Sequence, residues 1–196
     1  MQPLHPPRIK ICCISSVEEA WAAIRAGASA LGLVSSMPSG PGVIPEPLIA
    51  QIAARVPPPI GTFLLTSLQD ADAIIAQQRR CRTNTVQLCD RLPSGAYASL
   101  RAGLPGISLV QVIHVTGEPS LTEALEIAPH VDALLLDSGN QTLAVKELGG
   151  TGRVHDWSVS ARIREQVDCP VFLAGGLKPE NVAEAIARVA PFGLDL

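Results

Sequence analysis

Short apolar runs, many of them rich in β-branched residues, alternate along the whole chain with Ala-rich segments of helical period. A helix between two strands carries the chain back to the same edge of a sheet, so this alternation predicts parallel strands with right-handed crossovers. The expected strands cover 8–14, 30–34, 60–65, 85–88, 109–115, 131–136, 170–174 and 192–196. The expected helices cover 16–27, 45–56, 68–80, 93–103, 120–128, 158–167 and 179–189.

Eight such strands favour a closed (β/α)8 barrel, the TIM barrel, over an open doubly wound sheet. The main alternative is a Rossmann-like sheet, but the GxGxxG turn that such a sheet carries after its first strand is absent. No linker or change in composition marks a second domain, so residues 1–196 are expected to form one barrel domain. The sequence stops at the eighth strand, and the final helix of the barrel is therefore expected to be missing.

Composition and charge argue against several classes of protein. Hydrophobic residues make up 47% of the chain, so a disordered chain is not expected. The Lys and Arg residues are scattered, so no concentrated basic surface for nucleic acid is expected. No apolar run approaches the ~20 residues that a membrane span needs. The five cysteines form no disulfide framework, which predicts reduced thiols and a cytoplasmic protein. Cys12 and Cys13 are adjacent and lack CxxC or HxxxH spacing, so no metal site is expected.

Two residues suited to proton transfer lie where an apolar strand meets a loop, the place where barrel enzymes carry their catalytic groups. Cys12 lies near the end of the first run, and Asp137 ends the sixth. A free cysteine ionises near pH ~8.5, so a neutral-pH base needs a nearby cation, and Lys10 is the candidate. Apolar surroundings would raise the Asp137 pKa and suit it to general acid catalysis. The structural alternatives are a small buried hydrophobe for Cys12 and a turn or capping residue for Asp137.

Two Gly-rich turns offer backbone N–H groups to an anion. Glycine lets the backbone approach a phosphate closely, and barrels commonly bind phosphate in the loops after strands seven and eight. The expected contacts are Gly150, Thr151, Gly152, Gly175 and Gly176. The alternative is that these segments are only turns.

Taken together, these segments resemble the phosphoribosylanthranilate isomerase family, barrel enzymes of tryptophan biosynthesis. The similarity runs from end to end in family order and is most specific over 135–182. The matching stretches include Lys10-Ile11-Cys12, Leu135-Leu136-Asp137-Ser138, Gly149-Gly150-Thr151-Gly152 and Leu173-Ala174-Gly175-Gly176.

The resemblance implies an isomerase that converts N-(5-phosphoribosyl)anthranilate to 1-(2-carboxyphenylamino)-1-deoxyribulose 5-phosphate by an Amadori rearrangement. It implies that Cys12 is the general base at C2 of the sugar and that Asp137 is the general acid at the ring oxygen. Lys10 and the Gly-rich turns are expected to contact this sugar-phosphate substrate. No cofactor or metal is implied, because positioned proton transfers suffice.

The sequence departs from the family pattern at substrate-contacting positions. Cys13 stands where glycine is usual, 39–43 lacks an arginine, Cys89-Asp90 replaces His-Gly, and His114 stands where an arginine is expected. Two alternatives therefore stay open: a degenerate family member that acts as a binding or interaction protein, and a related isomerase for another sugar phosphate. Without a final helix, the outer faces of the first and eighth strands are expected to be uncovered. That predicts either low stability or a homodimer.

Overall fold

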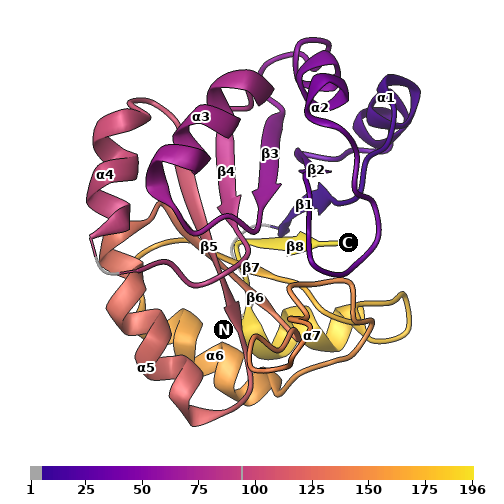
Figure 1. Ribbon diagram of the computed structural model, residues 1–196. Coiled ribbons are helices and arrows are strands. Elements are labelled where there is room, and N and C mark those ends of the chain that lie inside the picture. Colours follow the sequence, from indigo (N-terminus) through magenta and orange to yellow (C-terminus); the bar gives the residue numbers. More distant parts are fainter. Residues whose placement is uncertain (1–5, 94) are drawn as a thin grey trace.

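The computed structural model describes residues 6–93 and 95–196, and their strands form a closed parallel barrel (Figure 1). The strands follow one another round the barrel in sequence order, and β8 pairs with β1 to close it. They are β1 (Arg8–Ile11), β2 (Ala30–Val34), β3 (Gly61–Thr66), β4 (Thr85–Leu88), β5 (Ser108–His114), β6 (Ala133–Asp137), β7 (Val171–Leu173) and β8 (Gly193–Asp195). The predicted (β/α)8 fold is confirmed.

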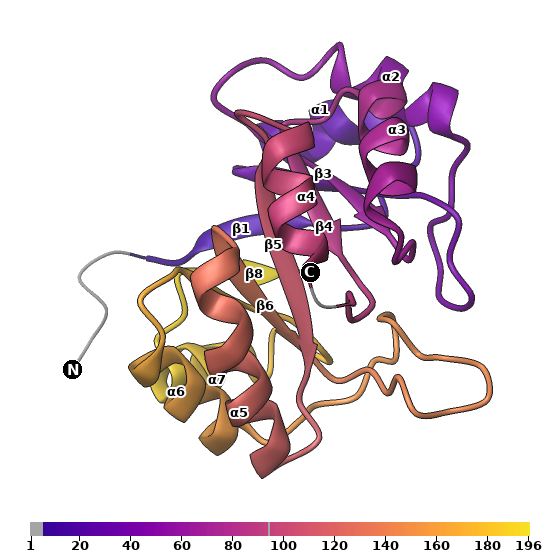
Figure 2. The same ribbon diagram turned by 60° about the vertical axis from the view of Figure 1, so that its left-hand side comes forward.

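Within the described chain, one α-helix follows each of the first seven strands and lies outside the barrel (Figure 2). The helices are α1 (Val17–Arg25), α2 (Glu46–Ala53), α3 (Ala71–Cys81), α4 (Ala96–Gly103), α5 (Glu118–Ile127), α6 (Trp157–Gln166) and α7 (Val182–Val189), and a 3₁₀ turn, Ala128–His130, follows α5. Of the helices described, none has the length and apolar character that crossing a membrane requires.

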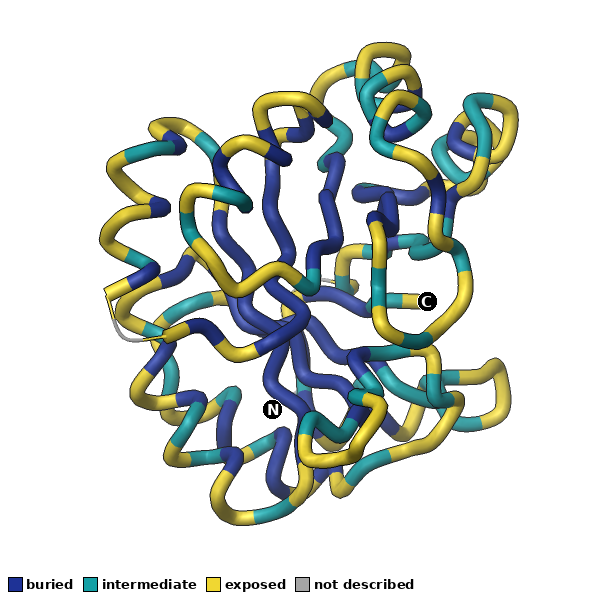
Figure 3. The backbone as a smooth tube through the Cα atoms, in the orientation of Figure 1, coloured by how far each residue is buried: buried dark blue, intermediate teal, exposed yellow. Residues whose placement is uncertain are grey.

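Alternation along each strand divides the core into two layers. The strands are the most buried part of the backbone, and the outer faces of the helices are exposed (Figure 3). In β6, Ala133 and Leu135 belong to the apolar cluster inside the barrel, whereas Leu134 and Leu136 belong to the cluster between strands and helices. Asp137 is the next inward position, so the same alternation directs its side chain toward the barrel mouth.

The first strand is shorter than predicted. It ends at Ile11 and not at residue 14, because Cys13 adopts a φ of +57°, which takes the chain out of the extended conformation. Ile14 then donates its N–H to the Gly32 carbonyl at 3.1 Å, which ties the turn to β2. Residues 12–14 therefore leave the sheet at the mouth of the barrel.

The expectation of uncovered outer faces on β1 and β8 is only partly right. Leu194 of β8 is buried in the cluster between strands and helices. Ile9 and Ile11 of β1 are half-buried and only pack against the edges of such clusters. α1 and α7 lie on either side of the β1–β8 pair in both ribbon views (Figures 1 and 2).

Candidate active site

A cavity of about 380 Å³ lies at the C-terminal ends of the strands and gathers most of the expected site residues. It is bounded by the ends of β1, β6 and β8 and by the loops that follow β6 and β7. Of the residues singled out from the sequence, those that line it are Cys12, Asp137, Gly150, Thr151, Gly152, Gly175 and Gly176. Positions more than a hundred residues apart in the chain thus share one cavity.

Lys10 lies one layer deeper and does not line this cavity. Its side chain is fully buried, and its Nζ donates to Asp195 Oδ1 at 2.7 Å. Burial alone would favour the neutral amine, but the Asp195 carboxylate raises the pKa of Lys10 above its ordinary value. The cation expected beside Cys12 is present, and Asp195 balances its charge.

Cys12 lies directly above that ion pair. A side chain on Gly32 of β2 would begin 2.9 Å from both the Cys12 Sγ and the Lys10 Nζ, so only glycine leaves room for the two groups. A hydrogen bond with the Cys13 thiol, together with burial, raises the pKa of Cys12 well above that of an ordinary thiol. Lys10 acts in the opposite direction but less strongly.

Cys13 also lines the cavity, although sequence reasoning gave it no role. Its Sγ lies 3.7 Å from the carbonyl oxygen of Pro41, in the loop after β2. The hydrogen bond from Cys12 lowers the pKa of the Cys13 thiol to about 7. The only signal in the sequence was a second cysteine where the family usually has glycine.

Asp137 is buried at the end of β6. Its Oδ1 accepts a hydrogen bond from the Ser138 N–H at 2.7 Å. The Ser138 hydroxyl in turn lies 2.6 Å from the Thr151 hydroxyl, which fastens the Gly-rich turn to the strand end. Gly175 adopts a φ of +81°, and a side chain there would begin 2.9 Å from Asp137 Oδ1. Glycine at this position therefore allows the turn after β7 to approach the carboxylate closely.

Lys178 is a cation at this cavity that the sequence analysis missed. It is exposed and follows the Gly175-Gly176 turn by two residues. That spacing was the available signal, since a lysine just beyond a glycine turn can reach an anion bound there. In the part of the chain that the structure describes, no group of three or more His, Cys, Asp or Glu side chains could hold a metal ion.

A smaller apolar hollow of about 50 Å³ continues from Cys12 toward β2, β3 and β4. Its walls include Val34, Met37, Leu65, Cys89 and Leu148. Two contacts between loops lie near it: Ser39 Oγ donates to the Lys146 carbonyl at 2.7 Å, and Lys146 Nζ donates to Asp90 Oδ2 at 2.5 Å. The loops after β2 and β6 therefore meet over this side of the mouth.

The side chains of His114 and Cys89 lie outside the cavity that Cys12 and Asp137 line. His114 Nε2 lies 3.0 Å from the carbonyl oxygen of Cys89, which directly follows β4. The imidazole is therefore hydrogen-bonded to the backbone there. Cys89 is buried, and burial raises the pKa of its thiol to about 12. Neither side chain lines the larger cavity at the mouth.

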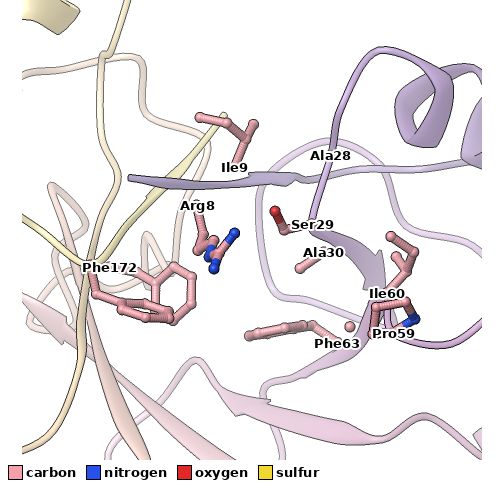
Figure 4. Close-up of a pocket in the computed structure, with 11 residues that line it drawn as sticks. Arg8, Ile9, Ala28, Ser29, Ala30, Pro59, Ile60, Phe63 and Phe172 are labelled. Atoms are coloured by element: carbon pink, nitrogen blue, oxygen red, sulfur yellow. The ribbon is translucent and has the colours of Figure 1, made fainter. Parts of the chain in front are cut away.

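Another hollow, of about 490 Å³, lies at the opposite end of the barrel (Figure 4). Its walls come from the N-terminal ends of the strands and include Arg8, Ala30, Phe63 and Phe172. None of the residues singled out from the sequence lines it. Barrel enzymes perform their chemistry at the C-terminal face, so the cavity that holds Cys12 and Asp137 is the candidate active site.

Comparison with known proteins gives a consistent result. The family model described as "PRAI: N-(5'phosphoribosyl)anthranilate (PRA) isomerase" matches residues 9–196. N-(5'-phosphoribosyl)anthranilate isomerase 2 of Methanosarcina mazei is 40% identical over 190 residues, which cover 96% of this chain and 83% of that protein.

Two solved structures are similar in fold along nearly the whole chain. One is a phosphoribosyl anthranilate isomerase in complex with reduced 1-(o-carboxyphenylamino)-1-deoxyribulose 5-phosphate, with a TM-score of 0.79 and 26% identity over 97% of this chain and 87% of that one. The other shows mutually generated monomers of the dimeric isomerase from Thermotoga maritima, with a TM-score of 0.76 and 25% identity over 97% of this chain and 87% of that one.

Proposed function

The chain belongs to the N-(5'-phosphoribosyl)anthranilate isomerase family, an isomerase family of tryptophan biosynthesis, and we propose that Cys12 and Asp137 carry the two proton transfers of its reaction. The observation that carries this proposal is the shared cavity. Cys12 from the end of β1 and Asp137 from the end of β6 line it together with the glycine turns. A thiol and a carboxyl group are then available to one small sugar phosphate.

In the proposed mechanism, Asp137 first donates a proton to the furanose ring oxygen. The bond from C1 to that oxygen breaks, and the nitrogen lone pair forms a Schiff base at C1. Cys12 then removes the proton on C2. The electron pair of that C–H bond forms a C1=C2 double bond, and the positive charge on the iminium nitrogen is neutralised. Tautomerisation of the enaminol gives the 2-ketone. A positioned acid or base contributes about 10²–10⁴-fold in rate to steps of this kind.

The phosphate of the substrate is assigned to the glycine turns. Gly175 and Gly176 follow β7, and Gly150 and Gly152 flank Thr151 in the loop after β6, all at the same cavity. Lys178 supplies a positive charge there. The anthranilate ring is assigned to the side of the mouth where the small apolar hollow lies, because the walls there are mostly hydrophobic. At about 50 Å³, the hollow itself holds only part of that ring.

The test is conversion of N-(5'-phosphoribosyl)anthranilate by the purified chain, followed as loss of substrate. We expect turnover by the wild type and a loss of about 10²-fold or more in Cys12→Ala and in Asp137→Asn. Cys169→Ala is the matched control, because Cys169 lies just before β7 at the other end of the barrel. An inactive wild type would refute the function, and wild-type rates in both variants would refute the assigned roles.

We also propose that two copies of the chain associate. The support is the half-buried state of Ile9 and Ile11 on the outer face of β1, and the similarity to an isomerase described as dimeric. Covering such apolar surface stabilises an interface in proportion to its area. Sedimentation equilibrium should give a mass near twice that of the chain, and a monomer at every concentration would contradict the proposal.

A further inference from the structure

The chain has three phenylalanines, and all three line the hollow at the N-terminal end of the barrel (Figure 4). Phe63 comes from β3, Phe172 comes from β7, and Phe192 directly precedes β8. The rings of Phe63 and Phe172 meet edge to face with their centres 6.0 Å apart, and those of Phe172 and Phe192 do so at 5.5 Å. Segments far apart in the sequence therefore supply one aromatic wall.

Two glycines let these rings lie against strand backbone. A side chain on Gly193 of β8 would begin 2.6 Å from the Phe172 ring, and one on Gly61 of β3 would begin 3.1 Å from the Phe63 ring. Phe192 leaves about half of its surface, 49%, exposed at the edge of the hollow. The space that remains is about 490 Å³. Binding sites for small molecules are commonly of this size and are lined mainly by hydrophobic and aromatic side chains.

Arg8 brings a positive charge into this hollow. Lys10 of β1 is buried inside the barrel, so alternation along the strand directs Arg8, two residues earlier, to the same inner side. Figure 4 shows the Arg8 guanidinium directed into the space that Phe172 and Phe63 border. No Asp or Glu carboxylate among residues 6–93 and 95–196 lies within 4.0 Å of it, and residues 1–5 and 94 include no Asp or Glu.

The inner charges of β1 and β8 therefore do not balance at the base of the barrel. The Lys10 ammonium is neutralised by Asp195, 2.7 Å away, whereas the Arg8 guanidinium has no such partner. An anion in the hollow would supply one. Arginine binds a carboxylate through two parallel hydrogen bonds, and its planar, weakly hydrated head group packs well beside aromatic rings. Charge and wall together favour a ligand that is apolar at one end and a carboxylate at the other.

We propose that this hollow is a second binding site, for a small aromatic carboxylic acid whose carboxylate pairs with Arg8 and whose ring packs against the three phenylalanines. The site is distinct from the cavity at the mouth, because the two have no lining residue in common. It does not depend on the reaction at Cys12 and Asp137. A sugar phosphate fits this hollow less well, because aromatic walls do not replace the hydrogen bonds that its hydroxyl groups would lose.

Isothermal titration calorimetry of the whole chain with 2-naphthoate tests the site. We expect the wild type to bind 2-naphthoate at least about tenfold more tightly than 2-naphthalenemethanol, which has the same rings and no charge. Arg8→Gln should weaken 2-naphthoate by about tenfold or more and leave the affinity for 2-naphthalenemethanol nearly unchanged. Arg188→Gln, which removes an exposed arginine of α7, is the matched control and should bind as the wild type does.

Phe192→Ala is a second variant, and it should weaken both compounds, because it removes part of the aromatic wall. Thermal unfolding verifies that each variant is folded, and kcat/KM should stay at the wild-type value in both. Failure of the wild type to bind 2-naphthoate would overturn the assignment. So would equal affinity in Arg8→Gln and Phe192→Ala, which would place the compound at another site such as the mouth. Absent binding with a lower sedimenting mass for Phe192→Ala would show that a second copy of the chain fills the hollow instead.

Discussion

The ammonium nitrogen of Lys10 lies 2.7 Å from the Oδ1 atom of Asp195, at the seam where β8 closes onto β1. The two residues occupy paired positions in the register of these strands. Lys10 is fully buried and the Asp195 side chain is almost so. The ion pair therefore joins the first and last strands of the barrel inside its core.

Removal of the carboxylate should destabilise the barrel strongly. Asp195→Ala leaves a buried ammonium without its partner, and breaking such a pair costs about 3–5 kcal/mol. Denaturant unfolding monitored by circular dichroism measures the change. The double variant Lys10→Met with Asp195→Leu should recover most of the loss, because no charge then stays buried. Glu184→Gln, which removes an exposed pair with Arg188, is the control and should have little effect. An Asp195→Ala barrel as stable as this control would contradict the assignment.

The close approach of the β7 turn to Asp137 predicts a specific loss of catalysis. Gly175→Ala places a methyl group 2.9 Å from Asp137 Oδ1 at a residue with a φ of +81°, so both the turn and the carboxylate must shift. We expect kcat to fall by about 10²-fold or more, since the general acid moves. Gly27→Ala is the matched control, with a φ of +100° and no atom within 4 Å of the new methyl group. It should lose stability by ~1 kcal/mol and keep its kcat. Equal kcat in the two variants would rule out this role for Gly175.

Lys178 should affect substrate affinity more than turnover. Lys178→Gln removes the exposed cation at the edge of the cavity and leaves the thiols and Asp137 in place. We expect KM to rise roughly tenfold, equivalent to ~1.4 kcal/mol of binding, with a smaller change in kcat. Steady-state kinetics at two salt concentrations measure this, because screening should weaken binding in the wild type more than in the variant. Arg188→Gln, on the exposed side of α7, is the control. An unchanged KM in Lys178→Gln would place the phosphate elsewhere.

The free energy of unfolding should depend on pH through Glu19, at the start of α1. Glu19 accepts from the Ser15 hydroxyl and N–H, both at 2.7 Å, and these hydrogen bonds lower the pKa of Glu19. A carboxyl group with a lowered pKa stabilises the fold above its unfolded pKa, and this contribution is lost as the pH falls through the folded value. Glu19→Ala should therefore lower the unfolding free energy by up to ~1 kcal/mol at pH 7.

The difference between Glu19→Ala and the wild type should shrink once the pH drops below about 4. Unfolding curves collected at several pH values provide the comparison. Glu18→Ala, an exposed neighbour in the same turn, serves as the control. A difference that stays constant down to the lowest pH would mean that the carboxylate charge of Glu19 does not contribute.

The alternation of apolar and helical segments was sufficient to predict the barrel, and the strand ends were sufficient to place Cys12 and Asp137 at one mouth. The partner of Lys10 was not predictable in the same way. Asp195 becomes its neighbour only through the register in which β8 meets β1, and that register is set by closure of the whole ring. Lys178 was missed because nothing local distinguishes it from any exposed lysine. It becomes distinctive only when the turns after β6 and β7 meet at one cavity.

The early end of β1 has a similar cause. Residues 12–14 continue an apolar run and read as strand, but backbone conformation at Cys13 depends on the loop that covers it. Pro41 and Gly42 lie against that side chain, although they are 28 and 29 positions further along the chain. Propensity along the strand carries no information about such a neighbour. The turn at Cys13 could therefore be located only after the loop was placed.

The hollow of about 490 Å³ at the N-terminal ends of the strands lies away from the candidate active site. Ala30 and Phe63 border it near the starts of their strands, whereas Cys12 and Asp137 lie at the far ends. Both side chains are buried in the cluster inside the barrel, and the Lys10 ammonium lies 5.5 Å from the centre of the Phe63 ring, so the base is packed core as well as a hollow. Laboratory selection for heat resistance should accordingly favour larger apolar side chains that fill this hollow and keep Phe63, leaving the upper rim almost untouched.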